Sequence, residues 1–134
     1  MPFVLDNSVT MAWCFADEAN AYTRDIRRHL DENDAVVPVI WPFEVANALL
    51  VAERRGRITE AQTGRFLEFL STMPITVDTD TDPSELQMVL VGREYGLTAY
   101  DACYLELAIQ QGLPLATQDA QLRAAAGRAG VPLM

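Results

Sequence analysis

Short apolar runs alternate along the whole chain with longer segments of helical periodicity, and no other feature restricts the possible folds as strongly. The apolar runs lie at residues 3–6, 36–41, 75–77, 115–117 and 131–134. The helical segments lie at 9–33, 42–55, 59–72, 83–95, 98–111 and 120–129. This alternation predicts an α/β domain with a mostly parallel, buried sheet and right-handed crossovers. Since the 134 residues contain no internal repeat or low-complexity linker, we expect a single domain spanning 1–134.

Local signals predict several helix boundaries. Pro42 suits the first helical position, where its missing N–H needs no partner, and Gly56 ends the same segment. Thr98 and Asp101 resemble a capping box in which Asp replaces Glu. Pro38 conflicts with the second apolar run because proline removes a donor from a strand ladder. That strand therefore starts at Pro38 or is shorter than the run.

Composition excludes several classes of protein. Half of the residues are hydrophobic and 22% are charged, which rules out intrinsic disorder. The longest apolar run, residues 35–43, contains two prolines and ends at Glu44, well short of the ~20 residues that span a bilayer. The first residues lack the basic region and long apolar stretch of a secretion signal, so we expect a cytoplasmic protein.

Reactive residue types other than acids are scarce. All ten basic residues are arginine, which excludes a P-loop lysine and Schiff-base catalysis. The only histidine, His29, lies in a polar stretch that favours a solvated helix position. Cys14 and Cys103 fit no paired metal-ligand spacing, so we expect small buried thiols. Acid–base chemistry in this chain must rest on carboxylates.

Four acids occupy similar places in the predicted elements. Asp6 follows the first apolar run, Glu44 and Asp101 each lie in the first turn of a helix, and Asp119 opens the last helix. In a parallel sheet these places face the same edge, where ligands usually bind. Each acid also has an ordinary explanation, because helix starts favour Asp caps and acids by ~0.3–1 kcal/mol. The functional prediction therefore depends on the set.

Four carboxylates in one crevice, with no lysine to neutralise them, would repel each other unless cations bind there. Oxygen ligands without histidine or thiolate suit Mg²⁺ or Mn²⁺. Such ions activate water and stabilise the attacking and leaving oxygens of a phosphodiester. The set therefore favours hydrolysis of a nucleic acid.

Four motifs resemble, in order and spacing, those of the PIN-domain ribonucleases, and most closely the VapC-type toxins of type II toxin–antitoxin pairs. The motifs are Leu5-Asp6-Asn7-Ser8 and the segments at 42–49, 97–105 and 114–119. The resemblance covers essentially the whole chain. It implies a three-layer PIN-like domain in which a mostly parallel five-stranded sheet is flanked by helices.

The resemblance also assigns roles by position. Asp6, Glu44 and Asp101 match the family's characteristic acids, and Asp119 matches a more variable fourth. These four would be catalytic and hold Mg²⁺ or Mn²⁺, and the hydroxyls of Ser8 and Thr117 would support the pocket. The implied activity is that of a metal-dependent endoribonuclease toxin, which directs water at an RNA phosphodiester and leaves a 5′-phosphate and a 3′-hydroxyl.

The same resemblance implies partners other than RNA. A cognate VapB-like antitoxin would place a helical segment in a groove formed by the early helices, and a second copy of the chain would form a homodimer. Asn47, Tyr100 and Tyr104 lie near the motifs. Asn47 suits either an orienting or a surface role, and the tyrosines suit either the crevice or the core, so the predicted catalytic set omits them.

The net charge of -9 opposes tight binding of an RNA backbone. Without the four candidate ligands, 15 acids still face ten arginines. Two arginine clusters, 24/27/28 and 54/55/57, offer phosphate contacts, although solvated helix faces explain each cluster more simply. We therefore expect weak substrate affinity, with the chemistry confined to the metal site.

Three other classes share parts of this pattern. Receiver and haloacid-dehalogenase-like domains group acids at strand ends but rely on a lysine, which this chain lacks. Dinucleotide-binding folds need a G-x-G-x-x-G after the first strand, and none is present. A catalytically silent PIN-like module that only binds proteins stays open as the alternative, and the intact acid set disfavours it.

Overall fold

Four short strands form the centre of the fold. They are β1 (Phe3–Leu5), β2 (Ala35–Val37), β3 (Ile75–Val77) and β4 (Leu115–Ala116). In the computed structural model, which describes residues 1–134, the strands pair in the order β3-β2-β1-β4 and every pairing is parallel. All three residues of the central strand β1 are fully buried, as expected for a parallel sheet that is covered on both faces. The carboxyl ends of the strands therefore share one edge.

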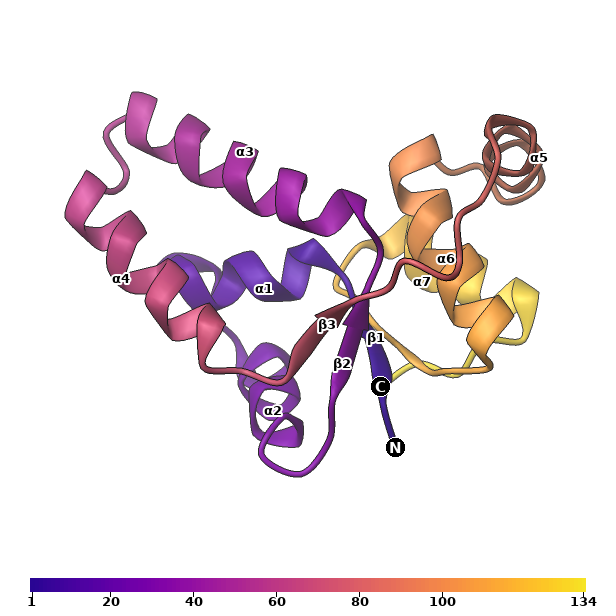
Figure 1. The fold of residues 1–134 in the computed structure, drawn as a ribbon, viewed down its shortest axis with the longest axis horizontal. Helices are drawn as coiled ribbons and strands as arrows, with labels where there is room; N and C mark the ends of the chain where they lie inside the picture. The colour runs from indigo at the N-terminus through magenta and orange to yellow at the C-terminus, as the bar shows by residue number, and fades with distance from the viewer.

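Helices cover both faces of this sheet, with one group on each side (Figure 1). One group contains α1 (Asn7–Cys14), the 3₁₀ helix η1 (Ala16–Glu18), α2 (Ala21–His29), α3 (Ile40–Arg54) and α4 (Glu60–Ser71). The other contains α5 (Glu85–Tyr95), α6 (Ala99–Gln111) and α7 (Ala120–Ala129). The predicted parallel sheet flanked by helices is confirmed. None of these helices combines the length and the apolar character that crossing a membrane requires.

The prediction of a fifth strand is wrong, because residues 131–134 form only a single parallel bridge between Leu133 and Leu115. Two backbone hydrogen bonds flank that bridge, from the Leu115 N–H to Pro132 and from the Met134 N–H to Leu115. The ladder does not extend further because Pro132 has no N–H and the Val131 N–H is already bonded to Ala126 at the end of α7.

The predicted helix at 9–33 is three separate helices. The chain turns into an extended conformation at Phe15, whose buried side chain follows α1. Asn20 then begins α2 with a capping box: its side chain accepts from the Thr23 N–H, and the Thr23 hydroxyl accepts from the Asn20 N–H. This strong local start signal interrupts what reads in the sequence as one continuous segment.

The second apolar run contains both a strand and a helix start. β2 ends at Val37, immediately before Pro38, and α3 begins at Ile40 rather than at Pro42. Proline cannot donate to the ladder, so the strand stops there and the chain turns into the helix. Glu44 is consequently the fifth residue of α3 and lies beyond the first turn in which it was expected.

The two thiols and the histidine test the remaining structural expectations. Cys14 and Cys103 are free and half-buried, so the prediction of buried thiols is only partly right. The side chain of His29 is 44% exposed at the end of α2, as predicted for a solvated helix position.

Candidate active site

Asp6 follows β1 and caps the N-terminus of α1, where its side chain accepts from the Ser8 N–H. The same oxygen, Oδ2, also accepts from the Ser8 hydroxyl at 2.6 Å and from the Thr117 hydroxyl at 2.8 Å. Thr117 belongs to the segment after β4, so this carboxylate does more than cap its own helix. Asp6 is only 5% exposed, and this burial raises its pKa while the hydrogen bonds from Ser8 and Thr117 oppose the rise.

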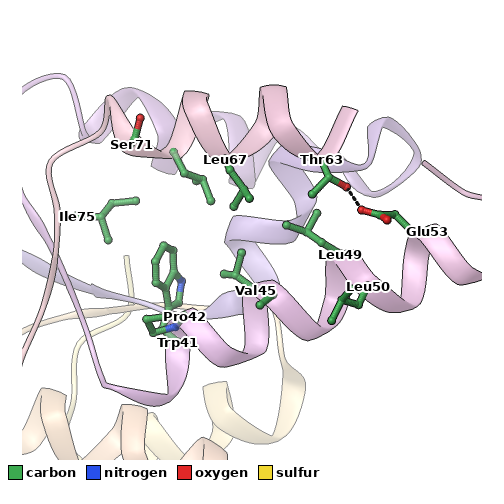
Figure 2. A pocket seen from close by; sticks show the side chains of 12 residues that line it. Trp41, Pro42, Val45, Leu49, Leu50, Glu53, Thr63, Leu67, Ser71 and Ile75 are labelled. Atoms are coloured by element: carbon green, nitrogen blue, oxygen red, sulfur yellow. Dashed lines mark hydrogen bonds between the residues drawn. The ribbon is translucent and has the colours of Figure 1, made fainter. Parts of the chain in front are cut away.

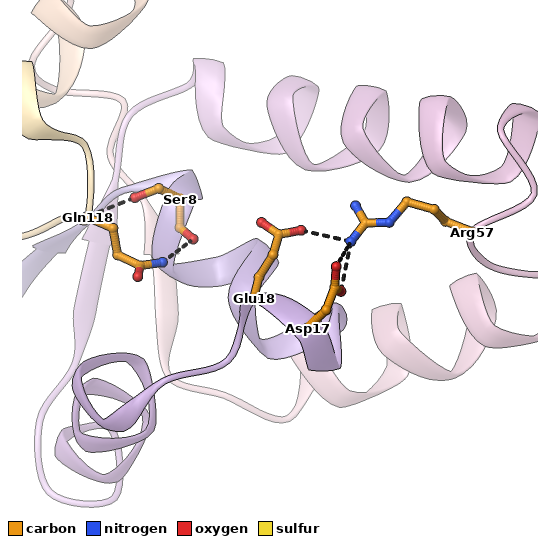
Figure 3. Close-up of polar contacts among 5 residues, drawn as sticks. All are labelled: Ser8, Asp17, Glu18, Arg57 and Gln118. Carbon is orange, nitrogen blue, oxygen red and sulfur yellow. Dashed lines mark hydrogen bonds and ion pairs between the residues drawn. The ribbon is translucent and has the colours of Figure 1, made fainter.

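The segment after β4 is fastened to α1 by further contacts through Ser8. Figure 3 shows Gln118 beside Ser8: its backbone N–H donates to the Ser8 hydroxyl at 3.0 Å, and its side-chain amide donates to the Ser8 carbonyl at 3.2 Å. The fully buried Thr117 hydroxyl also accepts from the Asp119 N–H at 3.0 Å. Ser8 and Thr117 therefore link Asp6 to the segment that carries Asp119.

Glu44 projects from α3 and contacts α6. Its Oε1 accepts a hydrogen bond from the hydroxyl of Tyr104 at 2.5 Å. The pKa of Glu44 is raised, chiefly by burial and then by the charges of Asp6 and Asp101, while the Tyr104 hydrogen bond acts in the opposite direction. The pKa of Tyr104 is also well above its ordinary value, because the ring is buried and its hydroxyl faces this carboxylate.

Asp101 is the third residue of α6. Its N–H donates to the hydroxyl of the capping residue Thr98 at 3.1 Å, so half of the predicted capping box is present. Burial, followed by the charges of Asp6 and Asp119, raises the pKa of Asp101 to about 6.

Asp119 is the N-cap of α7, with Oδ1 accepting from the Leu122 N–H at 2.8 Å. The ordinary capping explanation is thus correct for Asp119, but it is incomplete, because the charge of this residue reaches Asp101. The Asp119 side chain therefore caps α7 and also contributes to the raised pKa of Asp101.

Hydrogen bonds connect the segments that carry the four predicted acids, from the Thr117 hydroxyl to Asp6 and from the Tyr104 hydroxyl to Glu44. The charge of Asp6 contributes to the raised pKa values of Glu44 and Asp101, and the charge of Asp119 contributes to the raised pKa of Asp101. The strand order explains the meeting, because β1 and β4 are adjacent and α6 packs against both. As they lie in this structure, no three or more His, Cys, Asp or Glu side chains form a group that could hold a metal ion.

The sequence of the whole domain matches a known family. The family model described as "PIN domain" matches residues 3–128, which is nearly the entire chain. This chain belongs to the PIN domain family.

Individual relatives of this PIN domain share parts of its sequence. Exonuclease VapC9 of Pyrobaculum aerophilum is 39% identical over 83 residues, a stretch that represents 61% of this chain and 59% of that protein. The chain thus matches less than two thirds of the length of this relative. A crystal structure of PAE2754, also from Pyrobaculum aerophilum, is 29% identical, with a TM-score of 0.69 over 93% of this chain and 87% of that one.

Two more distant structures share the fold of this PIN domain. A toxin–antitoxin complex from Klebsiella pneumoniae has a TM-score of 0.64 and 19% identity, covering 96% of this chain and 94% of that one. VapBC2 from Rickettsia felis, bound to a DNA fragment of its promoter, has a TM-score of 0.63 and 12% identity. The match covers 100% of this chain and 98% of that one.

The donor chemistry of the PIN domain's acid site fits Mg²⁺ or Mn²⁺. All four side chains offer carboxylate oxygens, with two hydroxyls beside them and no lysine anywhere in the chain. Mg²⁺ usually retains several waters and takes only one or two carboxylates, so it does not require a closed protein cage. The raised pKa values of Glu44 and Asp101 arise partly from like charges, which a divalent cation would offset.

Sequence reasoning missed the contact between Tyr104 and Glu44. For Tyr104 the sequence leaves both a crevice and a core position open, and the predicted catalytic set omits it; the ring is fully buried and its hydroxyl reaches Glu44. The usable signal is its position three residues after Asp101, because residues at this spacing share one helix face. Tyr100 and Asn47 are exposed, and neither contacts the four acids by a hydrogen bond.

Each arginine cluster contains a member that pairs closely with neighbouring acids. Arg57 donates to Asp17 at 2.8 Å and to Glu18 at 3.2 Å, as Figure 3 shows, and lies 4.0 Å above the Phe15 ring. Arg27 pairs with Asp31 at 3.0 Å on the surface of α2. These contacts favour the explanation of a solvated helix face for Arg27 and Arg57, whereas Arg24, Arg54 and Arg55 form no ion pair.

An apolar groove of about 570 Å³ lies between α3 and α4 (Figure 2). Trp41, Val45 and Leu49 form part of one wall, and Leu67 lies on the other. The only acid of the lining, Glu53, accepts from the Thr63 hydroxyl across the groove. None of the four predicted site acids lines this groove, so its size does not make it the catalytic centre.

Proposed function

We propose that this PIN domain is a metal-dependent endoribonuclease that acts in the cytoplasm as the toxin of a toxin–antitoxin pair. The observation that carries the proposal is that hydrogen bonds join the segments bearing the four acids: Asp6 to Thr117, two residues before Asp119, and Glu44 to Tyr104, three residues after Asp101. Family membership and the name of the VapC9 relative, an exonuclease, support nuclease chemistry.

In this proposal the four carboxylates hold Mg²⁺ or Mn²⁺, which would supply an activated water and stabilise charge on the scissile phosphate. Asp6 is kept in place by Ser8 and Thr117, so it enters the reaction already oriented. Glu44 is held by α6 through Tyr104. Because the domain carries a net charge of -9, we expect RNA to bind weakly away from this centre.

The direct test is RNA cleavage by purified Asp101→Asn protein. This change keeps the size of the side chain and removes its charge, so we expect a correctly folded variant that has lost ~100-fold or more of its Mn²⁺-dependent activity. Asp80→Asn serves as the control, because this acid is exposed and forms no ion pair or side-chain hydrogen bond. Equal cleavage by parent and Asp101→Asn would overturn the proposal.

A circular RNA substrate separates endonucleolytic from exonucleolytic cleavage. We expect the parent protein to linearise it, with 5′-phosphate and 3′-hydroxyl ends. Degradation of linear RNA alone would contradict the endonuclease assignment and favour the activity named for the VapC9 relative. Failure to cleave any RNA in Mn²⁺ would favour the alternative of a silent protein-binding module.

The proposed antitoxin partner has a candidate docking surface in the groove between α3 and α4. Leu50 and Leu67 are 47% and 46% exposed there, which suits the apolar face of a partner helix. With the antitoxin co-expressed, we expect Leu67→Glu to abolish complex formation and Leu86→Glu, at an exposed position on α5, to preserve it.

We also propose that two copies of the chain form a homodimer. Analytical ultracentrifugation of the purified protein checks this, and we expect the mass of a dimer.

A further inference from the structure

Tyr104 is fully buried, yet its hydroxyl lies against a half-buried carboxylate. The hydroxyl donates to Glu44 Oε1 at 2.5 Å, and this contact joins α6 to α3. A buried phenol oxygen without a partner is costly, so the acceptor Glu44 stabilises the hydroxyl in this position. Each residue therefore restricts where the other can lie.

Glu44 has a particular need for such a restraint. It lies half-buried near Asp6 and Asp101, whose charges repel it. A glutamate has several rotatable bonds and would move toward solvent under that repulsion if nothing held it. The Tyr104 hydroxyl engages Oε1 and leaves Oε2 without a hydrogen-bond partner in the protein.

The position of Tyr104 on its helix makes the restraint part of the same surface as the site. Tyr104 follows Asp101 by three residues in α6, so the two side chains share one face of that helix. Helix α6 thus supplies both an acid of the site and the donor that fixes an acid from α3.

We propose that Tyr104 is a positioning residue of the proposed metal site: by donating to Oε1, its hydroxyl restrains the Glu44 carboxylate, which would contribute to holding a divalent cation. This inference rests on the proposed function, because it takes Glu44 to be a metal ligand. It predicts that loss of one hydroxyl group, remote from solvent, weakens metal binding.

The test is a double-mutant cycle read by calorimetric titration with Mn²⁺ alone. We expect Tyr104→Phe, which keeps the buried ring, to weaken Mn²⁺ binding by ~10-fold, the lower end of the effect of removing an outer partner of a metal ligand. In a Glu44→Gln background, the same change is expected to have no further effect on Mn²⁺ affinity. Tyr95→Phe, on α5 and outside the site, is the matched control and is expected to bind Mn²⁺ like the parent.

Kinetics supply a second readout that a merely structural role would not produce. We expect Tyr104→Phe to lower kcat for RNA cleavage at fixed Mn²⁺ and to leave KM for RNA unchanged, because Tyr104 is fully buried. Circular dichroism of the variant in EDTA is expected to match the parent, since the ring is retained.

The possible outcomes separate this inference from the function on which it rests. If Glu44→Gln weakens Mn²⁺ binding but Tyr104→Phe does not, the positioning role is wrong and the metal centre stands. Equal weakening by Tyr104→Phe in both backgrounds would also overturn it, since the effect would then not pass through Glu44. If the parent protein binds no Mn²⁺, both the inference and the proposed function fail.

Discussion

At the scale of single residues, Asp101 shows the cost of gathering like charges. Burial and the charges of Asp6 and Asp119 raise its pKa from 3.8 to about 6. A carboxyl group whose folded pKa exceeds its unfolded pKa binds protons more tightly in the folded protein. Its contribution to stability is therefore greatest below pH 3.8 and declines as the pH rises to about 6.

Because the folded-state pKa of Asp101 is raised, removing its charge is expected to stabilise the protein at neutral pH. In EDTA at pH 7.5 we expect Asp101→Asn to melt at a higher temperature than the parent, because it removes a charge that repels its neighbours. The difference should shrink toward pH 4, where the parent carboxyl is protonated. Differential scanning calorimetry at both pH values checks this, and a variant that is less stable than the parent at pH 7.5 would contradict it.

At the scale of helices and strands, the cap of α6 links stability to the site. The Thr98 hydroxyl accepts from the Asp101 N–H at 3.1 Å and so fixes the helical turn that carries this acid. We expect Thr98→Ala to cost ~1 kcal/mol of unfolding free energy. We also expect it to weaken Mn²⁺ binding, because the first turn of α6 loosens.

The cap of α5 offers a matched control for that prediction. Ser84 accepts from the Gln87 N–H at 3.2 Å at the start of a helix that contributes none of the four acids. Ser84→Ala should therefore cost a similar free energy in urea unfolding and leave Mn²⁺ affinity unchanged. If both variants weaken Mn²⁺ binding equally, the cap of α6 has no special relation to the site.

Some helices and strands have the bounds that the sequence predicts, and others do not. β3 and α7 have the predicted bounds, because their patterns are bordered by clear turn and capping residues. The helix predicted at 9–33 is divided because Asn20 caps a new helix inside it, and α3 starts earlier than predicted because the chain turns into the helix directly after Pro38 ends β2. The missing fifth strand depends on hydrogen bonds of Val131 and Pro132 that are formed only in the folded chain.

The four acids of the candidate site could be predicted from the sequence, but the contact of Tyr104 could not. Strand ends and helix starts are readable in a sequence, and they indicated Asp6, Glu44, Asp101 and Asp119. The contact of Tyr104 with Glu44 joins residues 60 positions apart and depends on how α3 and α6 lie against each other. A single sequence contains no pattern that reports such packing directly.

At the scale of the whole molecule, the acid site is expected to connect metal binding to folding. A cation that binds only the folded protein raises its stability, by ~2.7 kcal/mol when its concentration is 100 times its Kd. We therefore expect Mn²⁺ to raise the melting temperature of the parent protein. The shift should be absent in a protein carrying both Asp6→Asn and Asp101→Asn, and an equal shift in that protein would place the effect elsewhere.

The central claim is that four carboxylates distant in the sequence together hold a divalent cation. Anomalous diffraction from crystals grown with Mn²⁺ tests it most directly, because manganese is located without reference to activity. The account predicts an anomalous peak within coordination distance of carboxylate oxygens from Asp6 and Asp101, beside Glu44 and Asp119. Crystals that contain Mn²⁺ elsewhere, with no peak among these four acids, would contradict it.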